Sequence, residues 1–155
     1  METLYYYDTP VGKIGIVQDG NAVTGLYFTV PASLLALLPV EESELHRRAA
    51  AQLHAYFSGK RKVFELPLSP RGTPFQRRVW EALQTIPYGE TRSYGQIAAQ
   101  VGNAKASRAV GMANNRNPIS ILIPCHRVIG ADGKLTGYGG GMHNKEWLLA
   151  LERTV

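Results

Sequence analysis

Three runs of strand-forming residues, separated by polar and turn-forming positions, occupy the start of the chain. They read LYYY, KIGIVQ and AVTGLYF, and the last two flank the turn-forming residues DGN, a pattern typical of a β-hairpin. Between residues 41 and 60 the apolar positions recur at helical spacing instead, and Gly59 is a natural helix end. The pattern predicts a small sheet with one helix against it.

Later in the chain the apolar positions follow helical spacing, and the helix starts are well marked. Thr73 suits an N-cap, Pro74 the first helical position, and Gln76 completes a capping box. We expect this helix to end near Gln84. The preceding segment KRKVFELPLSPRG mixes charges, prolines and a glycine, which suits a strand leading into a linker.

Two further short helices are indicated. Ser93 and Gln96 form another capping box, and the helix that they open should end near Gly102. The segment NAKASRAVGMANN should form the next helix, with Asn103 as its N-cap. Two short helices joined by a glycine-containing turn are typical of a DNA-binding helix-turn-helix, but also of a plain helical hairpin in a core.

The last part of the chain contains a strand, a loop and a helix. ISILI should be a short buried strand or extended segment, which Pro124 interrupts. DGKLTGYGGG is a glycine-rich loop. In the final helix, Trp147, Leu148 and Leu151 should share one apolar face, with Glu152 beside it.

These elements predict an α+β fold in two domains. A small N-terminal sheet with one helix would form a supporting domain over residues 1–68. A mostly helical C-terminal domain, with the helix-turn-helix and the candidate active-site cysteine, would follow over residues 69–155.

Composition narrows the class of protein. With 45% hydrophobic and 19% charged residues the chain is unlike a disordered one, and its longest early apolar stretch, VPASLLALLPV, is too short to span a bilayer. The start METLYYYDTP lacks a secretion-signal pattern, so a cytoplasmic location without membrane attachment is expected. The formal net charge of +5 favours a polyanionic partner, although excess Lys and Arg often serves solubility alone.

The single cysteine is the main candidate for chemistry. One cysteine excludes an internal disulfide, and the scattered histidines cannot complete a zinc site, so no metal is expected. Cys125 follows Pro124 and precedes His126 and Arg127; cationic or hydrogen-bonding neighbours lower the pKa of a thiol and make it a nucleophile. We expect an activated thiol at a strand end, and the alternative is a small buried hydrophobe.

Two other functions remain open from these residues. A Cys–His pair with an acidic partner also serves cysteine hydrolases, which regenerate their thiol. A DNA-binding regulator could use the helix-turn-helix, with the thiol as sensor or bystander.

The motif PCHRV, preceded by NPISILI and followed by GYGGG and KEWLLALE, resembles the O6-alkylguanine DNA alkyltransferases. The match runs from about Thr73 to Glu152, whereas residues 1–65 match only in general character. The resemblance implies direct-reversal repair of double-stranded DNA by a monomer without cofactor. The alkyl group of O6-alkylguanine would move irreversibly to the cysteine after base flipping, in a single turnover. Whether O4-alkylthymine is a second substrate is left open by the resemblance. Alkyltransferase-like proteins that recognise damage without transfer lack this cysteine.

The resemblance also assigns catalytic roles. Cys125 would attack the alkyl carbon, His126 would take the thiol proton, and Glu152 would hold the imidazole in the required tautomer. Asn117 would be the hinge asparagine that braces the turn around the cysteine, and Tyr94 would donate a hydrogen bond to the leaving guanine.

DNA contacts are implied for the helix-turn-helix. Arg108 would fill the space that the extruded nucleotide leaves, and small residues around it would let the helix approach the minor groove closely. The DNA-binding set expected from the resemblance is Ser93, Tyr94, Ala106, Ser107, Arg108 and Gly111.

The remaining implied contacts form the base pocket. Tyr138 would pack on the flipped base, and the Gly139 backbone N–H would point toward O6. Family members often carry another small residue, sometimes serine, at the Gly139 position, so only the backbone contact carries over. Carbonyls near Cys125 and Val128 would recognise the guanine amino group.

Overall fold

The computed structural model describes residues 1–135, 138 and 141–154. The chain divides into two compact units, Met1–Pro70 and Arg71–Val155. This division lies two residues beyond the domain boundary that we expected after residue 68. Among the described residues, no helix has both the length and the hydropathy needed to cross a bilayer.

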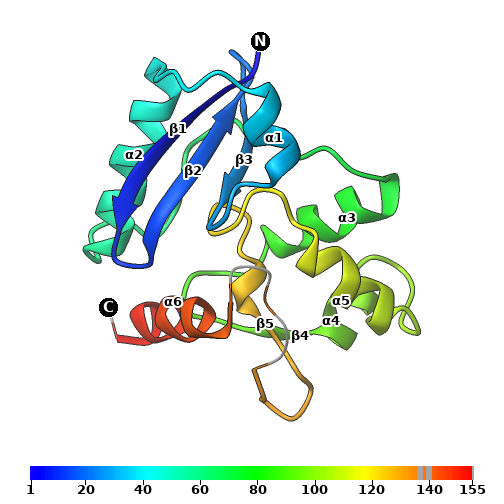
Figure 1. Cartoon of the computed structure of the whole chain (residues 1–155). Helices are drawn as coiled ribbons and strands as arrows, with labels where there is room; N and C mark the ends of the chain where they lie inside the picture. The colour runs from blue at the N-terminus through cyan, green and yellow to red at the C-terminus, as the bar shows by residue number, and fades with distance from the viewer. Residues whose placement is uncertain (136–137, 139–140, 155) are drawn as a thin grey trace. The chain divides into compact units, whose positions relative to one another are not determined.

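The first unit contains a three-stranded antiparallel sheet in the order β1-β2-β3 (Figure 1). Its strands are β1 (Thr3–Thr9), β2 (Gly12–Gln18) and β3 (Val23–Tyr27). The Asp19 carboxylate accepts hydrogen bonds from the Asn21 and Ala22 backbone N–H groups, at 2.9 and 2.8 Å, and Gly20 has a φ of +96°. The hairpin predicted at DGN is therefore confirmed.

Helix α2 (Glu44–Phe57) lies against β1 and β2 (Figure 1). It ends before Gly59, whose φ is +76°, so the helix predicted for this segment is confirmed. The sequence prediction missed a second helix, α1 (Ala32–Leu37), which is six residues long, has no buried residue, and is flanked by Pro31. The strand expected in KRKVFELPLSPRG is reduced to one isolated bridge between Leu68 and Val23.

His46 joins α2 to the sheet. Its side chain is fully buried. Its Nδ1 accepts a hydrogen bond from the Ser43 backbone N–H at 2.9 Å, so the neutral ring carries its proton on Nε2 and donates it to the Ile16 carbonyl at 3.0 Å. Protonation of Nδ1 would break the first bond, and burial also lowers the pKa of His46.

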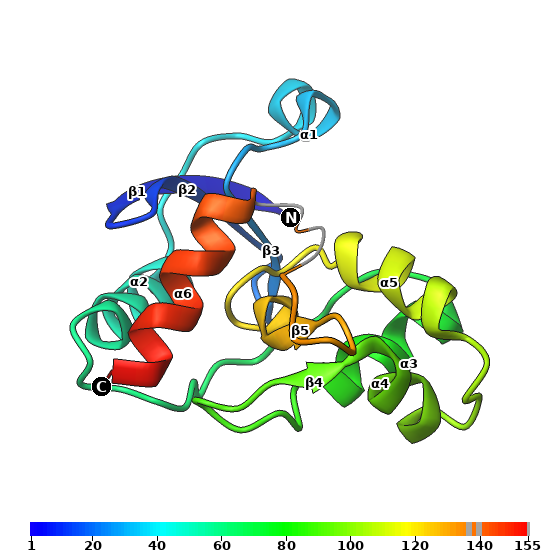
Figure 2. The same cartoon turned by 90° about the horizontal axis from the view of Figure 1, so that it is seen from below.

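The second unit has helices α3 (Pro74–Leu83), α4 (Tyr94–Gln100) and α5 (Ser107–Asn115) packed on one another (Figure 2). Strands β4 (Arg92–Ser93) and β5 (Val128–Ile129) form a short parallel pair, and the 3-10 helix η1 (Cys125–Arg127) precedes β5. Helix α6 (Met142–Thr154) contacts η1. The capping boxes predicted at Thr73 and Ser93 are both present. These elements confirm the α+β fold class.

Helix α5 begins three residues later than the Asn103 cap predicts. The Asn103 side chain accepts a hydrogen bond from the Lys105 N–H at 3.2 Å, and its carbonyl accepts one from the Ala106 N–H at 3.0 Å. These bonds close a turn instead of starting a helix, since asparagine satisfies turns as readily as caps. Helices α4 and α5 and the turn between them nevertheless form the predicted helix–turn–helix arrangement.

The segment ISILI is buried, but it forms turns and not a strand. The Ile123 N–H donates to the Ile119 carbonyl at 3.0 Å, and the Leu122 N–H donates to the Ser120 carbonyl at 2.8 Å. Ile121 adopts a φ of +69°, a costly conformation for a β-branched residue. The surrounding packing therefore outweighs the strand propensity of these residues.

We predict that His46 makes the first unit sensitive to acid. Because the pKa of folded His46 lies below the ordinary value of 6.5, the unfolded chain binds the proton first, and stability is lost as pH falls through that value. Urea unfolding measures the free energy of unfolding at about pH 7.5 and at about pH 5. The decrease between these two pH values should be larger in the native protein than in His46→Gln, by on the order of 1 kcal/mol. Glutamine is the usual capping-box residue at this position. The exposed His54→Gln should behave like the native protein, and equal losses in all three would refute the assignment.

Candidate active site

Cys125 lies at the start of η1 and is 3% exposed. The expectation of a thiol at a strand end is therefore wrong, because the residues before it form turns and those after it a 3-10 helix. Burial raises the pKa of the thiol, while hydrogen bonding from Asn117 and Tyr138 and the charge of Lys145 act in the opposite direction. The thiol thus lies in a dry site with donors and a cation around it.

His126 and Glu152, expected as the proton acceptor and its orienting partner, are in direct contact. The His126 Nε2 lies 2.7 Å from Glu152 Oε2, and both side chains are buried. Burial lowers the pKa of His126, and the Glu152 contact opposes this shift. His126 Nδ1 is buried, and no hydrogen-bond partner for it occurs within the described part of the chain. A neutral ring that donates Nε2–H to Glu152 therefore keeps a lone pair on Nδ1.

We expected Arg127 to act as a cation beside the thiol, but its guanidinium binds Glu152 instead. Its Nε donates to Glu152 Oε1 at 2.7 Å, and its Nη2 donates to Glu152 Oε2 at 3.1 Å. Its Nη1 donates to the Ile86 carbonyl at 2.8 Å. Burial alone would raise the pKa of Glu152, but the hydrogen bonds and charges of His126 and Arg127 hold it well below its usual range.

Lys145 on α6 is the cation whose charge acts to lower the pKa of the thiol, and the sequence prediction missed it. The buried residues of α6 are Lys145, Leu148, Leu149 and Glu152. Of the face predicted through Trp147, Leu148 and Leu151, Leu148 is buried with Glu152 beside it, whereas Trp147 and Leu151 are only half-buried. Positions 145, 148, 149 and 152 have the i, i+3, i+4, i+7 spacing of one helix face. That spacing, with a lysine and a glutamate inside it, was the signal available in the sequence.

Two asparagines hold the turn that carries Cys125. Asn117 Oδ1 accepts from the Ile119 N–H at 3.0 Å, and its Nδ2 donates to the Ile123 carbonyl at 2.9 Å. Asn114 Nδ2, from α5, donates to the Cys125 carbonyl at 3.3 Å. The Asn117 side chain therefore satisfies backbone N–H and carbonyl groups of the ISILI turns. The Asn114 side chain links α5 to the backbone of the cysteine.

The residues expected to bind DNA lie on or next to α4 and α5. Arg108 is exposed, Ala106 and Ser107 are half-buried, and Ser93 caps α4. The Tyr94 ring lies against α5, because a Cβ at Gly111 would be 3.7 Å from it. A Cβ at position 111 would be in ordinary van der Waals contact with the ring, so the packing of Tyr94 does not itself require glycine there.

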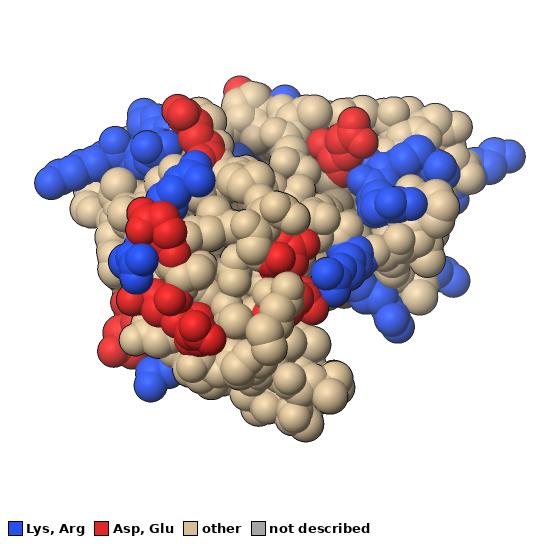
Figure 3. All heavy atoms as spheres, turned by 90° about the horizontal axis from the view of Figure 1, so that it is seen from above, with Lys and Arg blue, Asp and Glu red and all other residues tan. Residues whose placement is uncertain are grey.

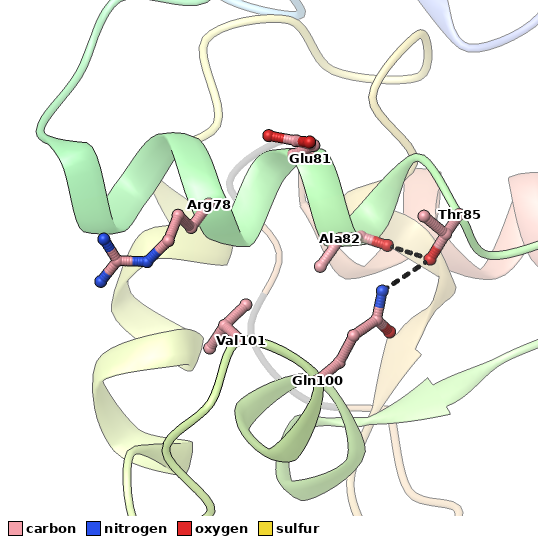
Figure 4. Close-up of a pocket in the computed structure, with 6 residues that line it drawn as sticks. All are labelled: Arg78, Glu81, Ala82, Thr85, Gln100 and Val101. Carbon is pink, nitrogen blue, oxygen red and sulfur yellow. Dashed lines mark hydrogen bonds between the residues drawn. The ribbon is translucent and has the colours of Figure 1, made fainter.

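Hydrogen bonds also connect α4 to α3, beside a pocket of about 320 Å³ (Figure 4). Gln100 Nε2 donates to Thr85 Oγ1 at 3.0 Å, and Thr85 Oγ1 donates to the Ala82 carbonyl at 2.6 Å. Helix α3 also contacts both α4 and α5. The helix pair is therefore supported by a third helix.

The excess positive charge belongs to the second unit. Met1–Pro70 has six Lys and Arg against seven Asp and Glu, whereas Arg71–Val155 has eleven against five. On the face that Figure 3 shows, Lys and Arg gather in several groups, with acidic side chains beside some of them. The unit with the helix-turn-helix is thus the one suited to a polyanion.

The residues expected around a flipped base are described only in part. Tyr138 is 8% exposed, and Val128 is fully buried. Gly139 lies outside the described residues. The structure thus brings Cys125, His126, Glu152, Asn117 and Tyr138 together, while their catalytic and binding roles stay predictions. The fold and this site define an α+β protein with a helix-turn-helix and a buried cysteine beside a His–Glu–Arg network.

Comparison with known proteins identifies the family. Residues 4–70 match the 6-O-methylguanine DNA methyltransferase ribonuclease-like domain, and residues 74–154 match the DNA binding domain of the same family. The chain therefore belongs to the 6-O-methylguanine DNA methyltransferase family.

Similar proteins span nearly the whole chain. A methylated-DNA-protein-cysteine methyltransferase of Mycolicibacterium paratuberculosis is 67% identical, covering 94% of this chain and 89% of the relative. One of Methanosarcina acetivorans is 52% identical, covering 96% and 98%. The crystal structure of Mycobacterium tuberculosis OGT in complex with DNA has a TM-score of 0.92 and 49% identity, covering 98% of this chain and 93% of that one.

We predict that removing the Arg127 guanidinium strongly destabilises the second unit. Arg127→Met leaves the buried Glu152 carboxylate without its main counter-charge, which should lower the free energy of unfolding by about 3–5 kcal/mol. Adding Glu152→Gln should recover part of that loss, because no uncompensated anion then remains. The exposed Arg153→Met on α6 should change stability by less than about 0.5 kcal/mol. Urea unfolding measures all of these, and equal effects of Arg127→Met and Arg153→Met would contradict the prediction.

Proposed function

We propose that this protein repairs double-stranded DNA by moving the alkyl group of O6-alkylguanine to Cys125, once per molecule. The observation that carries the proposal is the buried thiol next to His126, whose Nε2 is hydrogen-bonded to Glu152 and whose Nδ1 lone pair remains. The full-length relatives named methylated-DNA-protein-cysteine methyltransferase support it. The relative whose structure contains DNA supports DNA as the partner.

The chemistry is an in-line displacement at the alkyl carbon. The Cys125 thiol gives its proton to His126 Nδ1, directly or through a water, and the sulfur forms a bond to the alkyl carbon. The bond from that carbon to guanine O6 breaks, and its electrons leave with the guanine. The guanine then takes up one proton, so the products are a thioether on Cys125 and normal guanine. Glu152 stabilises the imidazolium that forms in between.

The target base must leave the duplex, because the thiol is buried and O6 lies inside the base stack. Arg108, exposed on α5, enters the gap that the base leaves. Ser93, Ala106, Ser107 and Gly111 lie along the DNA backbone or let it approach. Tyr94, which starts α4, presses on the target phosphate and donates a hydrogen bond to the leaving guanine.

The base then lies in a pocket of the second unit. Tyr138 packs on it, the Gly139 N–H approaches O6, and the carbonyls of Cys125 and Val128 accept hydrogen bonds from its amino group. Asn117 keeps the turn in place. Residues 69–155 carry DNA binding and transfer, and residues 1–68 support them. The protein acts as a monomer in the cytoplasm, where a single thiol stays reduced.

Intact-protein mass spectrometry tests the proposal directly. After incubation with a duplex carrying one O6-methylguanine, the native protein should gain one methyl group, and Cys125→Ser should gain none. If the lesion persists and the protein stays bound to the DNA, the protein would be a damage-recognition module or a regulator. If the protein neither reacts nor binds, transfer is refuted and the cysteine hydrolase becomes the better candidate.

The role of Arg108 predicts a loss that depends on the duplex. Arg108→Ala should slow methyl transfer from duplex DNA by about tenfold or more, since the extruded base loses its replacement in the stack. Transfer from free O6-methylguanine base should change little. The exposed Arg48→Ala in the first unit removes the same charge and should have little effect on either reaction. If Arg108→Ala slows both reactions equally, Arg108 does not act on the duplex.

A further inference from the structure

Asn114 is a buried polar residue beside the cysteine, and the reaction proposed above does not use its amide. It lies in the last turn of α5 and is 1% exposed. Its Nδ2 donates to the Cys125 carbonyl at 3.3 Å, which fixes the orientation of the amide. Its Oδ1 is buried too, and the described residues supply no hydrogen-bond donor to it. An unpaired buried acceptor is costly, so packing alone would favour an apolar residue here.

The Cys125 carbonyl, to which this amide donates, already has two donors. The Val128 backbone N–H donates to it at the end of η1, and Asn114 supplies the second hydrogen bond. A carbonyl oxygen has two lone pairs, so a third donor must share one of them or displace a partner. The guanine amino group, which we propose binds this carbonyl, would be that third donor. The Asn114 bond is the one that can be exchanged, because the Val128 N–H belongs to the backbone that holds the thiol.

The end of α5 that carries Asn114 is held in place by α3. The carbonyl of Ala113, the preceding residue, accepts a hydrogen bond from Nε1 of the buried Trp80 at 2.8 Å. The backbone at Asn114 is therefore fixed, whereas its amide group can still turn about the side-chain torsions. Two donors to one carbonyl oxygen lie within about 6 Å of each other. The amide thus stays within reach of any group that binds at the Cys125 carbonyl.

Guanine and thymine differ in chemistry at the ring position that would approach this carbonyl. Guanine carries an amino group at position 2, which donates hydrogen bonds, whereas thymine carries a carbonyl there, which accepts them. Backbone carbonyls can only accept, so the carbonyls of Cys125 and Val128 alone would favour alkylated guanine and repel alkylated thymine. An amide offers a donor and an acceptor from one side chain. A single asparagine beside position 2 can therefore serve both bases.

We propose that Asn114 is a specificity-determining residue that reads position 2 of the extruded base. With O6-alkylguanine its Oδ1 accepts from the amino group, which also binds the Cys125 carbonyl. With O4-alkylthymine its Nδ2 donates to O2 and so admits a base that the carbonyls alone would exclude. In both cases the sulfur bonds to the alkyl carbon, the carbon–oxygen bond breaks with its electrons leaving on the base, and the base takes up one proton. The inference rests on the transfer reaction proposed above.

Asn114→Leu is the main test variant, because leucine has nearly the shape of asparagine and removes both polar atoms of the amide. It should fold, since it also removes the unpaired acceptor. Urea unfolding and near-ultraviolet circular dichroism check this first. The matched control is Asn115→Leu, which makes the same change at the exposed neighbouring position of α5.

Single-turnover methyl transfer is then measured from duplexes that carry O6-methylguanine, O4-methylthymine or O6-methylhypoxanthine, which has no group at position 2. Asn114→Leu should slow transfer from O4-methylthymine by about tenfold or more relative to O6-methylhypoxanthine. The guanine rate should change less, because the Cys125 lone pair that the variant frees can take the amino group. Asn115→Leu should leave these ratios as in the native protein. Equal slowing on all three bases would mean a purely structural role. Unchanged ratios would assign O2 to another donor, such as Lys145 at the Val128 carbonyl; either result overturns the proposal.

A change in the substrate tests the same contact in the native protein. The 2-thio analogue of O4-methylthymine carries a sulfur at position 2, which accepts hydrogen bonds weakly, so it should react several-fold more slowly than O4-methylthymine. Equal rates would refute a hydrogen bond to O2. If O6-methylguanine methylates Cys125 but O4-methylthymine does not, the role of Asn114 fails while the transfer reaction stands. If O6-methylguanine does not methylate Cys125 either, the transfer reaction itself is refuted and this inference with it.

Discussion

The buried Glu152 carboxylate is the interaction on which the rest of the second unit depends. It accepts hydrogen bonds from His126 and Arg127, and Arg127 in turn binds the Ile86 carbonyl. One anion therefore ties α6, η1 and the segment after α3 together. A buried carboxylate is tolerated only when its charge and its lone pairs are satisfied, and Arg127 does this with a bidentate contact. The same contact orients the imidazole next to the cysteine.

Burial serves the chemistry of this site as well as its stability. Burial raises the pKa of the Cys125 thiol and lowers the pKa of His126 and of Lys145, so it disfavours the charged form of each group. Fixed charges placed around them then decide which proton moves, and they act strongly because water does not screen them.

The segment before the cysteine has a sequence that favours strands, but it forms a turn held by side-chain hydrogen bonds. Ile121 takes a left-handed conformation, and Asn117 supplies hydrogen bonds that a neighbouring strand would have provided. Asn114, near the end of α5, reaches the Cys125 carbonyl. Helix α5, which we propose binds DNA, is thus joined to the cysteine both by a short stretch of chain and by side-chain hydrogen bonds.

The sequence by itself determined the parts of the fold whose hydrogen bonds close within a few residues. The hairpin at DGN and the caps at Thr73 and Ser93 are of this kind, because neighbouring residues supply both donor and acceptor. The motif around Cys125 also identified the family. Only the tertiary structure decided that Arg127 binds Glu152, that ISILI forms turns, and that Lys145 is buried and donates to the Val128 carbonyl. Those outcomes depend on which distant segments satisfy a buried charge or a backbone group, and such partners are chosen by packing, not by local propensity.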